Sequence, residues 1–193
     1  LFMLDGGAEE RAMRLIDELK AAGDTAGGVV EVRVHGLKSG FGSCMTYGEK
    51  LDARLAGAVM GVQAIKGVEI GLGFKAAALP GSRVHDEIFS EGGRFVRHTN
   101  NAGGIEGGMS NGEDIIIRAA MKPIPTLMRG LNTVDFVTGE KCRAAGERSD
   151  VAAICACEII VESVVAFTIA QAVSERLGGD NMAQVKSRYS ELY

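Results

Sequence analysis

The chain has 193 residues, a net charge of −4 at neutral pH and 46% hydrophobic residues. This length predicts a single domain over residues 1–193, and the composition is typical of a globular protein with its own core. Lys and Arg form no run, so the basic stripe of a typical nucleic-acid-binding protein is missing. No signal peptide is recognised, and the longest uncharged apolar run, 163–174, is too short to cross a bilayer. We therefore expect a cytoplasmic protein that binds neither nucleic acid nor membrane.

Glycine is unusually frequent and aromatic residues are scarce. There are 27 glycines, whereas aromatic residues make up 5% of the chain. So many glycines without a repeat indicate tight turns and close approaches of the backbone. The cysteines contain no C-x-x-C pair and the histidines are not spaced like zinc ligands, so we expect no metal site. We expect reduced, buried thiols at Cys44, Cys142, Cys155 and Cys157.

The first half of the chain alternates between helical and extended patterns. Apolar spacing predicts a helix over 9–22, which Gly23 ends, and a second helix over 49–66. Alternating valines predict a half-buried strand over 28–34, and a short strand is expected over 67–74. The glycine-rich stretch 36–42 and the longer stretch 80–111, rich in Gly, Asn and Ser, are typical of loops.

The second half begins with an apolar segment, 115–121, that is expected to be buried. The sequence KPIPT follows at 122–126 and cannot lie inside a helix, because its two prolines remove backbone donors. A strand is expected over 133–138, turning at Gly139. Residues 150–177 predict one long helix, apolar on most sides and therefore deep between other layers. Helices and strands without strict alternation favour an α+β fold with antiparallel sheets.

The segment NNAGGIEGGMSNGED, residues 100–114, is the first candidate for ligand binding. Its glycine pairs allow backbone N–H groups to approach a flat or anionic ligand closely. It matches neither the P-loop nor the dinucleotide-binding fingerprint. A glycine-rich hairpin without a ligand explains the same pattern.

KPIPT is the second candidate, because it presents Lys122 as a point-charge partner for phosphate beside the Thr126 hydroxyl. A surface lysine next to a proline turn is the alternative. The third candidate is ERSD, residues 147–150, directly before the long helix. Ser149 or Asp150 is expected to cap that helix, Arg148 could bind an anion at its N-terminus, and Asp150 could exchange a proton.

Charged and imidazole side chains elsewhere give weaker signals. Arginines and one lysine between 83 and 148 indicate either a site for a polyanionic small molecule or a solvated face. Among the histidines, His98 is the best placed, since it lies beside the Asn-rich segment.

Together these motifs resemble the chorismate synthase family. VQAIKGVEIG, NNAGGIEGGMSNGED, MKPIPTLM and ERSD before a long helix occur in the family's order, and the likeness extends from GDTAGGVVEV to GGDNM. The resemblance implies elimination of phosphate from 5-enolpyruvylshikimate 3-phosphate, an anionic small molecule, to give chorismate. It implies reduced FMN as cofactor and NADPH as a candidate reductant. It also implies a β-α-β sandwich, with long central helices against antiparallel sheets, in a homotetramer.

The resemblance also implies roles for individual residues. Proton transfer at the flavin is implied for Asp150, and flavin binding is implied for Gln63, Ala64, Gly107, Lys122, Pro123, Ile124, Pro125, Thr126 and Arg148. The family's amino-terminal segment, with a G-E-S-H-G motif and two catalytic histidines, has no counterpart here. The chain thus resembles the carboxy-terminal half, and we expect it to be inactive alone. The alternative is a non-catalytic flavin-binding or oligomerisation module of the same fold.

Overall fold

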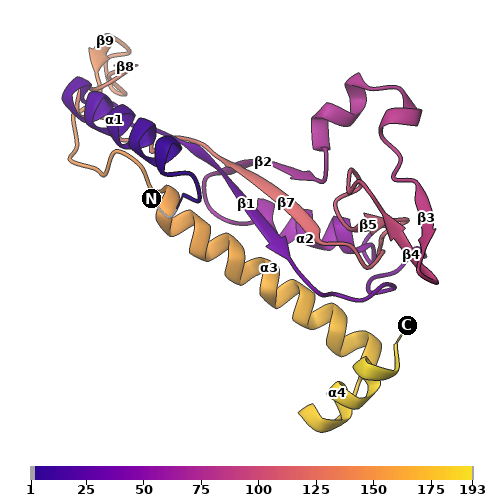
Figure 1. Cartoon of the computed structure of the whole chain (residues 1–193). Helices are drawn as coiled ribbons and strands as arrows, with labels where there is room; N and C mark the ends of the chain where they lie inside the picture. Colours follow the sequence, from indigo (N-terminus) through magenta and orange to yellow (C-terminus); the bar gives the residue numbers. More distant parts are fainter. Residues whose placement is uncertain (1–2, 193) are drawn as a thin grey trace.

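A three-stranded antiparallel sheet, in the order β1-β7-β2, lies at the centre of the computed structural model, which describes residues 3–192 (Figure 1). Its strands are β1 (Gly28–Val34), β2 (Ile65–Ile70) and β7 (Ile115–Met121). The predicted strand over 28–34 is confirmed, and the apolar segment 115–121 is the central strand. The α+β prediction with an antiparallel sheet is confirmed. Of the predicted domain, residues 1, 2 and 193 lie outside the described part.

The core lies between one face of the sheet and two helices, α2 (Leu51–Met60) and α3 (Ile154–Leu177). Alternate residues of β7 point into it, as the two-residue period of a strand requires. Its most deeply buried side chains are Phe41, Leu51, Leu55, Val59, Ile115, Ile117, Val161 and Val165.

The predicted helix over 49–66 is wrong at its C-terminal end. Helix α2 ends at Met60, and the backbone reverses near Ala64 before β2 begins at Ile65. Ile65 pairs with Met121 of β7, and this strand pairing overrides the helical spacing of the apolar residues. The expected strand over 67–74 is therefore shifted, and its last residues belong to a 3-10 helix, η1 (Gly73–Ala78).

Helix α3 begins later than predicted. It starts at Ile154, and Ala153 at its N-cap supplies no side-chain hydrogen bond, so the predicted caps at Ser149 and Asp150 are wrong. The Ser149 hydroxyl instead donates to the carbonyl of Thr126 at 2.8 Å, and the Val151 carbonyl accepts from Ala26 at 2.7 Å. These bonds tie the segment before the helix to residues 26 and 126 and keep it out of the helix.

Only one side of α3 is covered within this chain. Val161 and Val165 face the core, whereas Ile159 and Phe167 are 57% and 67% exposed. The prediction that this helix lies deep between other layers is therefore confirmed on one of its sides only. By length and mean hydropathy (1.8) the helix as a whole could also span a membrane, although its uncharged run 163–174 is too short to do so. Core helices of soluble proteins pass the same criterion.

The N-terminal helix α1 (Gly6–Ala22) begins three residues before the predicted start, because the Asp5 carboxylate accepts hydrogen bonds from the amides of Gly7 and Ala8. It ends where predicted, at Gly23, whose φ is 68°. The helix lies along the outside of the molecule, and none of its residues is buried in the described chain (Figure 1).

The region predicted as a long loop contains two small hairpins. They are β3 (Ile88–Glu91) with β4 (Arg94–Arg97), and β5 (Ile105–Glu106) with β6 (Met109–Ser110). A short 3-10 helix, η2 (Gly81–Arg83), precedes them. A further hairpin pairs β8 (Asn132–Val134) with β9 (Lys141–Arg143). The strand predicted over 133–138 is wrong beyond Val134, because the Asp135 carboxylate accepts from two amides and forms a turn.

A last helix, α4 (Met182–Glu191), was not predicted. It folds back from the end of α3 and covers the glycine-rich loop 36–42 (Figure 1). The Tyr189 hydroxyl donates to the Gly36 carbonyl at 2.6 Å and accepts from the Lys38 amide at 3.1 Å. The Tyr189 ring also stacks on Phe41, so the C-terminal helix fixes this loop.

Candidate functional site

Two cavities lie on either side of the start of α3, and the segment 122–126, which follows β7, lines one of them. Their volumes are about 490 and 580 Å³, within the range of small-molecule sites. The first, here the apolar cavity, is lined by Val62, Gln63, Ala64, Met121, Lys122, Pro123, Ile124, Pro125, Ala153, Ala156, Cys157 and Ile160. The second, here the polar cavity, is lined by Ile16, Asp17, Lys20, Gly23, Asp24, Thr25, Met128, Arg148, Ser149, Asp150, Val151, Ala152, Ile154 and Cys155.

The apolar cavity is built where the start of β2 meets the end of β7. The Lys122 amide donates to the Ala64 carbonyl at 2.9 Å and joins two segments far apart in the sequence. Ala64 has a φ of 71° and is the one non-glycine residue with positive φ among residues 3–192. Such strain costs about 1–3 kcal/mol and is typical of functional sites. The backbone outlier therefore marks this cavity as a candidate site.

Close packing behind the cavities fixes their shared walls. A Cβ atom on Gly27 would overlap the carbonyl oxygen of Met121, and one on Gly28 would lie 2.7 Å from the Ile154 side chain. The Thr25 hydroxyl donates to the Ile124 carbonyl at 2.7 Å. The start of β1, the KPIPT segment and the first turn of α3 are therefore held together without intervening space.

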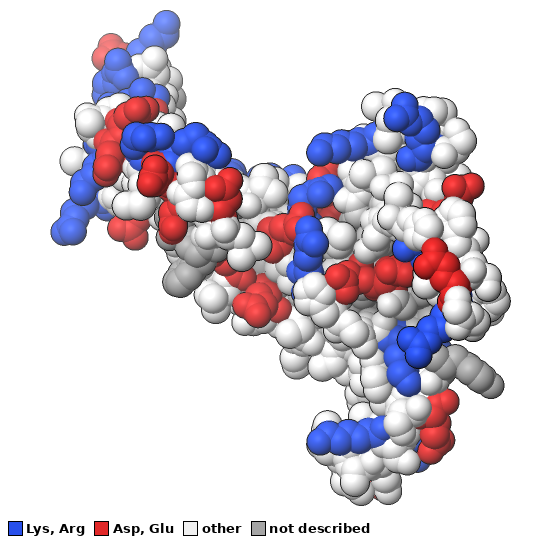
Figure 2. Space-filling model, viewed as in Figure 1, with Lys and Arg blue, Asp and Glu red and all other residues white. Residues whose placement is uncertain are grey.

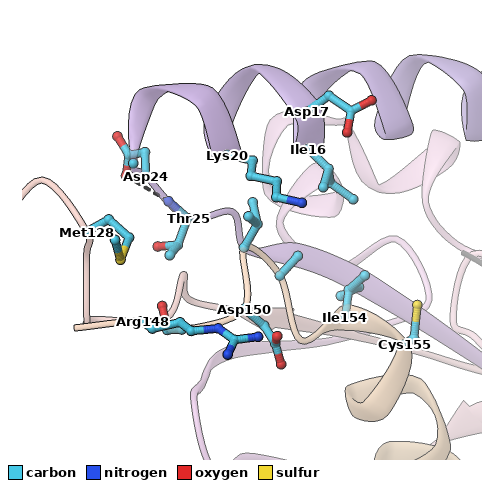
Figure 3. A pocket seen from close by; sticks show the side chains of 14 residues that line it. Ile16, Asp17, Lys20, Asp24, Thr25, Met128, Arg148, Asp150, Ile154 and Cys155 are labelled. Atoms are coloured by element: carbon cyan, nitrogen blue, oxygen red, sulfur yellow. Dashed lines mark hydrogen bonds between the residues drawn. The ribbon is translucent and has the colours of Figure 1, made fainter. Parts of the chain in front are cut away.

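The polar cavity brings helix α1 opposite the ERSD segment (Figure 3). Lys20 extends from α1 toward the space that Arg148 and Asp150 border from the other side (Figure 3). The Asp24 carboxylate is neutralised by Arg129 at 2.7 Å. Within residues 3–192, Lys20, Arg148 and Asp150 form no ion pair. Their charges are thus available to a ligand.

The structure brings most of the predicted site residues to this end of the sheet. Arg148 and Asp150 border the polar cavity, whereas Thr126 lines neither cavity and its carbonyl accepts from the Ser149 hydroxyl. The apolar cavity holds Gln63, Ala64, Lys122, Pro123, Ile124 and Pro125. Sequence reasoning missed Lys20, because only the folded position of α1 brings this helix to the ERSD segment.

Gly107 is not brought to the cavities. It lies in the β5–β6 turn, beside the start of β7, whereas Lys122 follows the end of that strand. Seven residues of strand separate the two ends by about 20 Å. A Cβ on Gly107 would meet no atom within 4 Å, whereas one on Gly108 would lie 2.5 Å from the Lys50 side chain. Packing therefore requires glycine at 108, while Gly107 is exposed and open to approach.

The first turn of α3 separates the two cavities. Cys155 faces the polar cavity and Cys157 the apolar one, as their spacing predicts. Burial and the neighbouring Glu158 charge raise the pKa of Cys157, so its thiol stays protonated. The expectation of four buried thiols is wrong for Cys44 and Cys142, which are exposed.

The scattered arginines do not converge on one polyanion site. Arg97 pairs with Glu106 at 2.9 Å and Arg118 with Glu69 at 3.0 Å. Over the visible face, Lys and Arg are interspersed with Asp and Glu (Figure 2). His98 lies outside both cavities, where it stacks on a phenylalanine and contacts a glutamate. No group of three potential metal ligands occurs among the described residues.

Comparison with known proteins identifies relatives for nearly the whole chain. The family model described as "Chorismate synthase" matches residues 1–174. The chorismate synthase of Pelobacter propionicus is 55% identical, over 98% of this chain and 50% of its own length. The chorismate synthase of Geobacter metallireducens is 56% identical, over 96% of this chain and 49% of its own length. The chain thus spans about half the length of the curated relatives it matches.

The fold is shared with a solved structure described as a crystal structure of chorismate synthase. The two superpose with a TM-score of 0.78 at 42% sequence identity, over 94% of this chain and 47% of the other. The predicted fold class is therefore confirmed, with helices packed on an antiparallel sheet.

Proposed function

The chain belongs to the chorismate synthase family, and from this premise we propose that it supplies half of an active site that converts 5-enolpyruvylshikimate 3-phosphate to chorismate. In this 1,4-elimination the C–O bond to phosphate breaks and a proton leaves the ring, with no net oxidation. The strained Ala64 in the wall of a ligand-sized cavity is the observation that carries the proposal.

The residues around the cavities fit reduced FMN as the cofactor. Pro123, Pro125 and Ile160 offer flat or aliphatic surface to a planar ring, and Gln63 offers an amide for hydrogen bonding. Lys122 and Arg148 offer positive charge to a phosphate. When bound, reduced FMN supplies an electron-rich ring to the elimination. NADPH remains the proposed reductant that keeps the flavin reduced.

The protein's own groups then have separable tasks. Lys122 and Arg148 bind and orient the anionic groups of the ligands, because an unpaired phosphate in a closed site is strongly unfavourable. The apolar walls exclude water. Asp150, which has no ion-pair partner in the described chain, holds or moves a proton at its carboxylate.

The site is incomplete in this chain. The chain matches half the length of its relatives, and α3 leaves Ile159 and Phe167 exposed on its outer side. We infer that the other half of a full-length family member covers this face and supplies the remaining site residues. A homotetramer in the cytoplasm is the assembly expected from the family resemblance.

Activity of the natural polypeptide that contains these residues tests the proposal. It is incubated without oxygen with reduced FMN and 5-enolpyruvylshikimate 3-phosphate, and chorismate and phosphate are measured. We expect both products in equal amounts, and light scattering is expected to show a tetramer. The 193-residue chain alone is expected to form no chorismate.

The competing reading is a non-catalytic flavin-binding or oligomerisation module. Retention of Lys122, Arg148 and Asp150 around one pair of cavities favours the enzyme. A natural polypeptide that binds FMN but releases no chorismate would establish the module instead.

A further inference from the structure

Helix α1 contributes a charged side chain to the polar cavity that neither the motifs nor the family resemblance assigned. Lys20 lies in the last turn of this helix, more than 100 residues before Arg148 in the sequence. Both residues line the same cavity of about 580 Å³, and Lys20 extends into the space opposite Arg148 and Asp150 (Figure 3). The fold thus brings two cations together from separate elements.

The cavity leaves these two cations without a protein partner. Lys20 and Arg148 are the lysine and arginine that line it, and neither forms an ion pair in the described chain. The nearby arginine outside the lining, Arg129, is bound to Asp24 at 2.7 Å. The hydroxyls of Thr25 and Ser149 donate to backbone carbonyls, so they orient the walls and do not compete for the cations.

We propose that Lys20 is a further ligand-binding residue, which with Arg148 forms a subsite for a phosphate monoester. A phosphate monoester carries about −1.5 to −2 charges at neutral pH, so one arginine does not neutralise it. Arg148 supplies a planar fork of donors and Lys20 a compact charge from the opposite wall. The proposal rests on the proposed function, whose cofactor and substrate both carry this group.

Three carboxylates line the cavity, and because Arg129 neutralises Asp24, two of them act on a bound anion. Asp17 lies one turn before Lys20 on α1, and Asp150 lies two residues after Arg148. Both carboxylates oppose the binding of an anion, and Asp17 is the one that can be neutralised without touching the proposed proton carrier, Asp150. Removing the charge of Lys20 should therefore weaken phosphate binding, and removing that of Asp17 should strengthen it.

The test compares ligands with and without phosphate in the natural polypeptide. FMN and riboflavin are titrated into the wild type and into Lys20→Met, Asp17→Asn and Arg14→Met, with flavin fluorescence as the signal. Arg14 lies on the same helix but does not line the cavity, so it is the matched control. The KM for 5-enolpyruvylshikimate 3-phosphate is measured at saturating reduced FMN.

The pattern of effects identifies which phosphate the subsite takes. If it takes the cofactor's phosphate, Lys20→Met weakens FMN about 10-fold and riboflavin less than 2-fold, the loss of about one charge-assisted hydrogen bond. If it takes the substrate's phosphate, the KM rises about 10-fold and FMN binding is unchanged. Asp17→Asn should tighten the same ligand about 2- to 5-fold, and Arg14→Met should leave it unchanged.

Other outcomes overturn the proposal. If Lys20→Met leaves both the FMN affinity and the KM for the substrate unchanged, or weakens FMN and riboflavin equally, Lys20 does not contact a phosphate. A wild type that binds no flavin and turns over no substrate defeats the proposed function. In that case inorganic phosphate, followed by ³¹P line broadening in wild type and Lys20→Met, still decides whether the subsite exists.

Discussion

The backbone amide of Lys122 donates to the carbonyl oxygen of Ala64 over 2.9 Å, and this bond closes the apolar cavity at the point where β2 begins and β7 ends. Ala64 makes this bond from a backbone conformation with a φ of 71°, in the left-handed region that a β-branched side chain avoids. The cavity wall and the strained residue are therefore one feature. A side chain at 64 decides whether the turn can form at all.

Replacing Ala64 tests this relationship. Ala64→Val should destabilise the protein by about 2 kcal/mol and weaken flavin binding, because valine is strongly disfavoured at positive φ. Ala64→Gly should stay within about 1 kcal/mol of wild type, since relief of strain offsets the added freedom of the unfolded chain. Thermal unfolding of the natural polypeptide measures both. Equal stability of the valine and glycine variants would show that the turn is not restrictive.

A second prediction concerns the contribution of the Lys122 charge to FMN binding. Lys122→Met should weaken FMN about 10-fold and should leave the fold intact, because the side chain is exposed and its amide keeps the bond to Ala64. Lys141→Met, in the β8–β9 hairpin outside both cavities, is the control and should bind FMN normally. Fluorescence titration gives both affinities. A loss shared by the two variants would indicate a general electrostatic effect.

Much of the fold could be predicted from local patterns in the sequence. Alternating Val30, Val32 and Val34 placed β1 correctly, and Gly23 ended α1 because its left-handed conformation suits glycine. The prediction of a helix over 49–66 was wrong at its C-terminal end. Ile65 pairs with Met121, and the local spacing of apolar residues does not reveal such a tertiary contact. Helix α4 was not predicted for the same reason, because its contacts are with the distant loop 36–42.

The sequence allowed the segments of the candidate site to be predicted, but not how these segments are arranged in space. The prolines of KPIPT excluded a helix and left Lys122 at the edge of a cavity, as a rigid loop should. The caps expected at Ser149 and Asp150 were wrong, because Ser149 bonds to Thr126 across the fold. Nothing in the local sequence indicates that α1 lies over this segment, so Lys20 could be found only in the folded chain.

Asp150 provides a test of catalysis separate from binding. Asp150→Asn should lower the rate of chorismate formation about 100-fold or more, the usual contribution of a positioned acid or base, and should not weaken FMN binding. Glu147→Gln removes a carboxylate from the same segment but outside the cavity lining and should keep full activity. Rates at saturating substrate and flavin decide the matter. An unimpaired Asp150→Asn enzyme would remove Asp150 from the proton transfer.

The hydroxyl of Tyr189 tests how α4 holds the loop 36–42. Tyr189→Phe keeps the ring that stacks on Phe41 but removes two hydrogen bonds, so stability should fall by about 1–2 kcal/mol. Amide hydrogen exchange should accelerate in loop 36–42. Tyr47→Phe is the matched control, because Tyr47 is 87% exposed. Exchange that accelerates equally across the sheet would instead indicate global unfolding.

Asp86 predicts a specific loss of stability in acid. Burial acts to raise its pKa, but hydrogen bonds from the Thr99 hydroxyl and from the amides of Ala102 and Asn101 outweigh burial, so the pKa lies below its ordinary value. A carboxyl group with a lowered pKa in the folded state binds protons less readily than in the unfolded chain. Its stabilising contribution is therefore complete above the unfolded pKa and is lost as the pH falls through the folded one.

Asp86→Asn should consequently cost about 1–2 kcal/mol at neutral pH, where the charged carboxylate holds the segment 99–102. The difference from wild type should shrink as the pH falls below 3.8, the ordinary value for this group. Urea unfolding at a series of pH values measures both proteins. A difference that stayed constant down to the lowest pH would mean that shape and not charge makes Asp86 stabilising. In that case the loop before Gly103 would depend on packing alone.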